Sequence, residues 1–125
     1  MESEPITLCY VGAGGFSNAC IYPQLAAHPV RLLGVCDLVE ERAQAAARRY
    51  GFERVYTDFR TMLETQQPEA VICVGGPQVH YEVGREVLAR GLPLYIQKSP
   101  APDAAATREL AALAAAHGVP CHVGF

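Results

Sequence analysis

The chain has 125 residues, half of them hydrophobic and 18% charged, which suits one globular domain with a core of its own. Its net charge is −3 and its Lys and Arg residues are scattered, which argues against nucleic acid or an anionic membrane as the main partner. The acidic start lacks the basic and long apolar regions of a signal peptide, and no apolar run reaches membrane-spanning length, so we expect a cytoplasmic protein.

Short apolar runs alternate with longer helical patterns along the chain. The predicted strands are Thr7–Val11, Arg31–Cys36, Val55–Tyr56, Ala70–Val74, Leu94–Ile96 and Cys121–Val123. The predicted helices are Ser17–Ala27, Val39–Tyr50, Phe59–Gln66, Val79–Arg90 and Ala104–His117. Continuous apolar runs are typical of parallel strands that helices cover on both faces. Repeated strand–helix–strand units predict an α/β fold with a doubly wound, mostly parallel sheet and right-handed crossovers.

Local signals mark several helix ends. Asp58 is placed to cap the third helix, while Gly51, Gly91 and Gly118 directly follow the ends of three others. Pro23 falls inside the first predicted helix, where it should kink that helix or delay its regular start.

The cysteines and histidines indicate neither disulfides nor metal. The five cysteines are odd in number, contain no Cys-x-x-Cys pair and lie mostly in predicted strands, so we interpret them as reduced core residues. The four histidines show no zinc-ligand spacing, and no metal site is expected.

A glycine-rich turn joins the first strand to the first helix. Residues 12–17 read Gly-Ala-Gly-Gly-Phe-Ser and match G-x-G-x-x-G, except that Ser17 stands at the third glycine. Gly12 permits the tight turn, and Gly14 lets the backbone approach a pyrophosphate. The helix N-terminus would supply free N–H groups for the phosphates, and Ser17 is small enough for close helix–strand packing. A glycine-rich turn without a ligand is the alternative.

Asp37 strengthens the dinucleotide interpretation. It ends the second strand, 20 positions after Ser17, where a carboxylate would accept hydrogen bonds from an adenosine ribose. A helix-capping role before Val39 is the alternative, and the two roles are compatible. A carboxylate here also disfavours the 2′-phosphate of NADP, so NAD is the expected cofactor. Arg42, the nearest basic residue, is interpreted first as a solvated residue on the helix face; the alternative, in which it softens this preference, leaves NADP as an option.

Two further motifs follow predicted strands. Gly75 and Gly76, with Pro77 fixing the turn, would allow close approach of a ligand at the end of the fourth strand. His80 would lie in the first turn of the next helix, where it either contacts cofactor or substrate or serves the structure. Lys98 follows the fifth strand, where open α/β sheets place ligands, although a surface lysine is the alternative.

The order and spacing of these motifs resemble the N-terminal domain of the Gfo/Idh/MocA oxidoreductases, named for glucose–fructose oxidoreductase and inositol dehydrogenase. The matching segments are Gly12–Phe16, Cys36–Asp37, Glu41–Ala43, Tyr56–Phe59 with Met62–Leu63, Pro77 with His80, Gln97–Ser99 and His122–Phe125. Gln97 and Ser99 stand where the family's Glu-Lys-Pro motif has Glu and Pro.

The resemblance implies roles for individual residues. The residues that would meet the pyrophosphate are Gly12, Gly14, Gly15 and Phe16. Asp37 would meet the ribose, and the residues that would lie along the rest of the cofactor are Gly75, Gly76, Pro77, His80 and Gln97. Lys98 would sit beside the nicotinamide, near the substrate hydroxyl, as the catalytic residue.

The implied activity is reversible hydride transfer between a nicotinamide and a sugar, cyclitol or related polyol. The family's second domain, which supplies most substrate contacts, is expected to be absent from these 125 residues, so the chain alone should show little turnover. A non-catalytic NAD(P)-binding module is the alternative, and the oligomeric state, including a homo-oligomer, stays open. A methyltransferase is disfavoured because no acid precedes the glycines and the Gln97–Lys98 segment would go unexplained.

Overall fold

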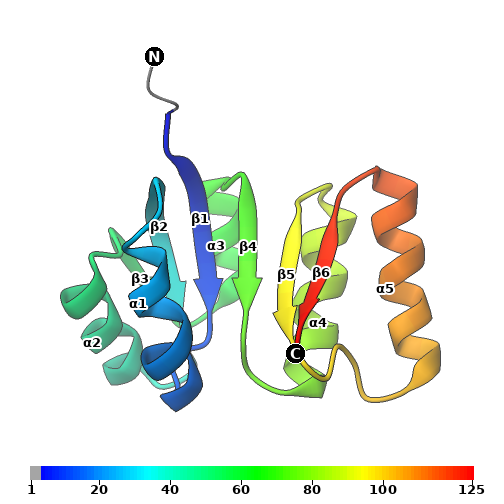
Figure 1. The fold of residues 1–125 in the computed structure, drawn as a ribbon, viewed down its shortest axis with the longest axis horizontal. Helices are drawn as coiled ribbons and strands as arrows, with labels where there is room; N and C mark the ends of the chain where they lie inside the picture. The colour runs from blue at the N-terminus through cyan, green and yellow to red at the C-terminus, as the bar shows by residue number, and fades with distance from the viewer. Residues whose placement is uncertain (1–3) are drawn as a thin grey trace. The chain divides into compact units, whose positions relative to one another are not determined.

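A computed structural model describes residues 4–125, which form two compact units, one ending at Glu69 and one beginning at Ala70 (Figure 1). The elements of the first unit are β1 (Ile6–Val11), the π-helix η1 (Ser17–Ile21), α1 (Tyr22–Leu25), β2 (Val30–Cys36), α2 (Glu40–Tyr50), β3 (Arg54–Tyr56) and α3 (Phe59–Gln66). Its strands are parallel in the order β3-β2-β1.

The second unit repeats the same strand–helix alternation. Its elements are β4 (Ala70–Cys73), α4 (Pro77–Ala89), β5 (Leu94–Gln97), α5 (Ala104–His117) and β6 (Cys121–Gly124). The strands are parallel in the order β4-β5-β6, and α4 packs against α5 and against β4 and β5. Among residues 4–125, no helix combines the length and the apolarity needed to cross a bilayer.

The α/β fold class is confirmed, and every predicted strand is present with each end within one residue of its prediction. The continuous apolar pattern has the expected cause: Leu8 to Val11 of β1 are buried one after another, as are Leu33, Val35 and Cys36 of β2. Cys9, Cys36 and Cys73 are buried thiols, whereas Cys121 is half-buried and Cys20 is exposed; all are free.

The first helix departs from regular α-helix because of Pro23. Residues 17–21 form a π-helix, and α1 begins only at Tyr22, with the proline in its first turn. Proline has no N–H to donate, so it disrupts the α-helical hydrogen-bond ladder but is tolerated where a helix starts. The predicted delay is therefore confirmed.

The other helix ends follow local chemistry. Asp58 caps α3 as predicted, accepting a hydrogen bond from the Arg60 N–H at 3.0 Å. Gly51 and Gly118 take the left-handed conformation that ends α2 and α5. Helix α4 begins two residues before the predicted start because Pro77, with its preset φ, occupies the first turn.

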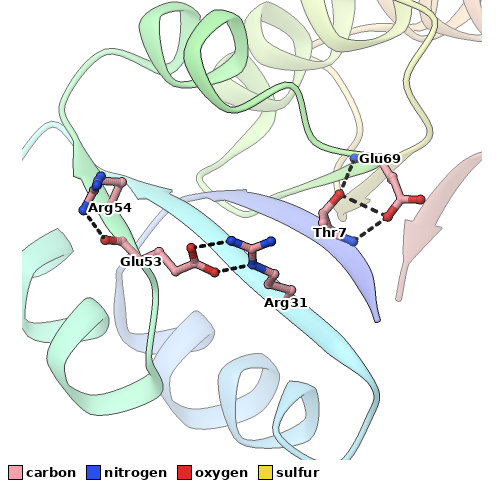
Figure 2. Close-up of polar contacts among 5 residues, drawn as sticks. All are labelled: Thr7, Arg31, Glu53, Arg54 and Glu69. Carbon is pink, nitrogen blue, oxygen red and sulfur yellow. Dashed lines mark hydrogen bonds and ion pairs between the residues drawn. The ribbon is translucent and has the colours of Figure 1, made fainter. Parts of the chain in front are cut away.

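Figure 2 shows polar contacts of Thr7, near the start of β1, and of Arg31, near the start of β2. The glycine-rich turn follows the other end of β1. Arg31 makes two hydrogen bonds to Glu53, at 2.6 and 2.9 Å, which lower the pKa of that carboxyl. Glu69 accepts from both the backbone N–H and the hydroxyl of Thr7, at 2.7 and 3.1 Å. Both contacts lie near the amino ends of β1 and β2, so they stabilise the fold and do not involve the carboxyl ends of these strands, where the candidate site lies.

Candidate functional site

The turn after β1 depends on Gly12 for its shape. Gly12 has a φ of 113°, a conformation that side-chain-bearing residues rarely adopt, and its N–H donates to the Cys36 carbonyl at 2.8 Å. This bond ties the turn to the carboxyl end of β2. The tight-turn role predicted for Gly12 is therefore confirmed in the geometry.

Gly14, Gly15 and Phe16 open the helical run that follows the turn. A Cβ built on Gly14 or on Gly15 would meet no atom within 4 Å, so space lies open beside the backbone there, and Phe16 is 47% exposed. Helical geometry begins at Gly15, and the first N–H groups of a helix have no acceptor within it. The side chain of Asn18 donates to the carbonyls of Ala13 and Gly14, at 3.1 and 2.8 Å. The turn therefore has bound carbonyls and open space beside its glycines.

Ser17 performs the packing role expected of the third glycine. Its side chain is 1% exposed and bonds to the hydroxyl of Tyr10, in β1, at 2.9 Å. The hydroxyl of Tyr22 donates to the Gly12 carbonyl at 2.6 Å. Two buried tyrosines, Tyr10 and Tyr22, thus hold the turn in place by hydrogen bonds to Ser17 and to the Gly12 carbonyl. No sequence motif predicted this role for either tyrosine.

Asp37 reaches across from the end of β2 to the same turn. Its Oδ2 accepts the Ala13 N–H at 2.8 Å, and its Oδ1 accepts the Val39 N–H at 2.8 Å. The N-cap residue of α2 is Val39, whose own side chain makes no capping bond, so Asp37 is not itself the N-cap; it contacts this helix end only through the Val39 N–H. The carboxylate therefore bonds both to the N-cap residue of α2 and to the glycine-rich turn, which places a negative charge beside that turn.

In the second unit, His80 organises the loop between β4 and α4. Its Nε2 accepts the N–H groups of Gly75 and Gly76, at 2.9 and 3.2 Å, and its Nδ1 is 2.7 Å from the Ser99 carbonyl. Two donors facing Nε2 require that nitrogen to be unprotonated, so the proton lies on Nδ1 and is donated to Ser99. His80 is 1% exposed, and burial lowers its pKa. Both ring nitrogens are occupied by the chain itself, which corresponds to the structural alternative for this residue.

The two glycines before α4 have different reasons to be glycine. A Cβ on Gly75 would lie 2.9 Å from Cγ1 of Val79, so a side chain there would collide with the helix. Gly76 has a φ of 124° and serves as the N-cap of α4, ahead of Pro77. Packing and backbone conformation therefore account for these glycines within the second unit.

Gln97 and Lys98 lie at the carboxyl end of β5, as predicted. The Lys98 backbone N–H donates to the Gly124 carbonyl at 2.9 Å, while its side chain is exposed. Gln97 Oε1 accepts a long 3.4 Å bond from the Tyr95 hydroxyl. Because His80 bonds to Ser99, the segment after β5 is held beside the loop after β4.

The structure thus assembles two groups of predicted residues, one in each unit. The first is the glycine-rich turn with Asp37, joined by the Ala13 N–H. The second is the Gly75–Pro77 loop and the Ser99 end of the Lys98 segment, joined by His80. Sequence reasoning missed Tyr22, because a hydroxyl ten residues from its acceptor leaves no local pattern.

Comparisons with known proteins agree with this geometry. Residues 6–125 match the family described as "Oxidoreductase family, NAD-binding Rossmann fold". D-Glucoside 3-dehydrogenase of Escherichia coli is 30% identical over 113 residues, which cover 88% of this chain and 32% of the enzyme. A dehydrogenase structure from Chromobacterium violaceum has a TM-score of 0.93 at 26% identity, covering 98% of this chain and 36% of that one. GenD2 from gentamicin A biosynthesis, solved in complex with NAD, has a TM-score of 0.88 at 27% identity, covering 98% of this chain and 35% of that one.

The chain spans about a third of the length of these relatives. Within that span, the family match begins at β1 and includes both groups of residues described above. The chain belongs to the Gfo/Idh/MocA oxidoreductase family, of which it forms the NAD-binding Rossmann domain.

Proposed function

We propose that the glycine-rich turn and Asp37 hold the pyrophosphate and the adenosine ribose of NAD, for hydride transfer to or from a sugar, cyclitol or related polyol in the full-length enzyme. One observation carries the cofactor half of this proposal: the Asp37 carboxylate is fastened to the Ala13 N–H of the turn. A ribose hydroxyl acceptor and a phosphate-binding turn are thereby held together within one unit.

The residues fit the proposed cofactor. Each oxygen of Asp37 accepts one backbone N–H and keeps a further lone pair for a ribose hydroxyl. The space beside Gly14 and Gly15 would admit phosphate oxygens close to the backbone. Gly12 and the exposed Phe16 complete the proposed contacts of this half.

The same carboxylate favours NAD over NADP. A 2′-phosphate placed at the ribose would bring its negative charge against Asp37, whose following residue is the uncharged and exposed Leu38. Arg42, in the first turns of α2, is the nearest basic residue in the sequence and would only partly offset that repulsion.

The second unit would supply the residues around the nicotinamide, which carries the hydride when bound. Gly75, Gly76 and Pro77 are proposed to lie along this part of the cofactor, with Gln97 bonding through its amide. Lys98, exposed at the end of β5, would hydrogen-bond the reacting hydroxyl and assist its proton transfer. His80 is proposed to position this loop, because its own nitrogens are already bonded to Gly75, Gly76 and Ser99.

The names of relatives support the substrate class. D-Glucoside 3-dehydrogenase acts on a sugar derivative, and an inositol 2-dehydrogenase of Lactiplantibacillus plantarum, 30% identical over 76 residues that cover 60% of this chain and 22% of that enzyme, acts on a cyclitol. Both substrates present secondary hydroxyls on a ring. We propose a substrate of that kind, a cytoplasmic location, and little turnover by the 125 residues alone, because substrate positioning supplies much of the rate in such reactions.

Calorimetric titration of the chain with NAD, NADP and S-adenosylmethionine tests the proposal. We expect NAD to bind more tightly than NADP and S-adenosylmethionine not to bind. Asp37→Ala should weaken NAD binding roughly 10- to 100-fold, the value of a hydrogen bond to a charged group. Glu41→Ala, which removes one negative charge from the first turn of α2, is the matched control and should change NAD affinity little.

The outcomes separate the alternatives. Binding of neither nicotinamide cofactor would overturn the proposal, and binding of S-adenosylmethionine in their place would favour a methyltransferase. NAD binding together with an inactive full-length protein would favour the non-catalytic binding module.

A further inference from the structure

A single peptide group in the glycine-rich turn is held from both ends. The Gly12 carbonyl accepts the Tyr22 hydroxyl at 2.6 Å, and the Ala13 N–H of the same peptide plane donates to Asp37 Oδ2 at 2.8 Å. Because a peptide is planar, the orientation of its carbonyl determines the direction of its N–H. Tyr22 therefore controls, through one rigid group, the donor that holds the Asp37 carboxylate.

We propose that Tyr22 is a positioning residue for NAD: its hydroxyl orients the Gly12–Ala13 peptide so that the Ala13 N–H holds Asp37 where the adenosine ribose binds. This inference rests on the proposed function and extends it to a residue that touches neither the phosphate nor the ribose. Tyr22 thereby influences discrimination between NAD and NADP, since that discrimination depends on where the Asp37 charge lies.

The surroundings of Tyr22 suit a fixed hydrogen-bond donor. Its ring is buried and packs against Tyr10, Tyr50 and Phe52, with ring centroids 4.7, 4.9 and 5.4 Å away. Burial raises the pKa of the Tyr22 phenol, so it keeps its proton and donates at every physiological pH. Packing on three aromatic rings restricts the ring, and little conformational entropy is left to lose when the hydrogen bond forms.

The local helix geometry places this hydroxyl. Tyr22 is the first residue of α1 and directly follows the π-helical turn η1. Pro23 comes next, in the first turn of α1. A π-turn holds more residues than an α-turn, so the side chains after it point in different directions from those of a regular helix. The delayed helix start thus has a consequence for the turn before it, because it brings Tyr22 to the Gly12 carbonyl.

The neighbouring tyrosines have other partners, which provides a matched control. Tyr50 belongs to the same aromatic cluster, but its hydroxyl donates to the Asn18 carbonyl at 3.2 Å. Tyr22→Phe and Tyr50→Phe each remove one hydroxyl and keep the ring. Only the first releases the Gly12–Ala13 peptide, so both variants should stay folded and only the first should affect Asp37.

A measurement without cofactor tests directly whether the Tyr22 hydroxyl affects the bond between the Ala13 N–H and Asp37. In the NMR spectrum of the 125-residue chain, the Ala13 amide proton should move upfield in Tyr22→Phe, because its bond to the carboxylate lengthens. Tyr50→Phe should leave that resonance in place. An Ala13 resonance that is the same in Tyr22→Phe and in the unsubstituted chain would overturn the inference, whatever the chain binds.

Calorimetry then tests the functional part. Tyr22→Phe should raise the Kd for NAD about 3- to 10-fold, the usual value of one hydrogen bond, and leave the Kd for NADP nearly constant. The preference for NAD should fall by the same factor, and Tyr50→Phe should keep both constants. In the Asp37→Asn background, Tyr22→Phe should have little further effect, because the two substitutions interrupt the same path.

The two proposals fail differently. If the unsubstituted chain binds no NAD, the proposed function is wrong and this inference falls with it. If the unsubstituted chain binds NAD and Tyr22→Phe matches it in both Kd values, the inference alone is wrong. A loss of affinity for NAD and NADP by one factor would also overturn it, because general damage to the turn would then explain the effect.

Discussion

Acidification should lower the free energy of unfolding, because the hydrogen bonds of His80 in the folded chain require a neutral ring. Nε2 accepts two backbone N–H groups, from Gly75 and Gly76, while Nδ1 bonds to the Ser99 carbonyl. A second proton on Nε2 would face both of those donors. Burial lowers the pKa of His80, and the hydrogen bond to Ser99 only partly opposes this effect.

The sign and size of the effect follow from proton linkage. The unfolded chain has a His80 pKa of about 6.5, above that of the folded chain, so between the two values the unfolded state binds more protons. The contribution of neutral His80 to the free energy of unfolding is therefore present above about pH 6.5 and is lost as pH falls through the folded pKa. For one proton, the slope is at most about 1.4 kcal/mol per pH unit.

Urea unfolding of the 125-residue chain between about pH 5 and pH 8 measures this slope. His80→Gln removes the titrating group but keeps a side-chain oxygen that can accept from the loop. It should cost about 1 kcal/mol near pH 7, where one hydrogen bond is lost, and progressively less as pH falls. His28→Gln, at an exposed position before β2, is the control and should keep the full slope. Equal pH slopes in His80→Gln and the unsubstituted chain would refute the reasoning.

Four further substitutions have expected outcomes, two from the site geometry and two from the proposed function. Gly14→Ala should keep the thermal stability of the chain, because its Cβ meets nothing within 4 Å, yet weaken NAD binding in a calorimetric titration. Gly75→Ala should instead lower the free energy of unfolding by about 1–3 kcal/mol, measured in urea, because its Cβ would lie 2.9 Å from Val79. If the proposed function holds, Lys98→Ala in the full-length protein should lower kcat about 10²- to 10⁴-fold in steady-state kinetics and leave the Kd for NAD nearly unchanged, whereas Asp37→Ala should raise that Kd and relax discrimination against NADP. An unchanged kcat would remove Lys98 from the catalytic residues.

Much of the fold could be predicted because its signals are local. Continuous apolar runs located the strands, and the capping residue Asp58 and the glycines after α2 and α5 marked helix ends that the structure confirms. The predicted start of α4, at Val79, was two residues too late. The apolar pattern begins at Val79, but Pro77 already has the backbone φ of a helix and lies in the first turn of α4. Such differences arise where the backbone, and not apolar periodicity, determines the boundary.

The candidate site also has features that the sequence predicted and features that only the structure shows. The glycine spacing and the position of Asp37 are local to two strand ends, and both were predicted with the role of Ser17 in packing. The sequence left a capping role for Asp37 open beside a ligand-binding one, and it gave no sign of the bond that the structure shows from the Ala13 N–H, 24 residues away, to the same carboxylate that bonds Val39. It decided likewise that His80 is braced between Gly75, Gly76 and Ser99.

The sequence by itself therefore determined the α/β class and the strand positions, and it supplied the residues of the candidate dinucleotide site. Only the tertiary structure decided which groups hold those residues in place, above all the Tyr22 hydroxyl on the Gly12 carbonyl. The physical reason is the separation of the interacting residues along the sequence. Apolar periodicity and glycine spacing involve residues close together in the chain, so they can be recognised in the sequence. A hydrogen bond depends on position and angle to within fractions of an ångström, and those are established only when separate elements pack together.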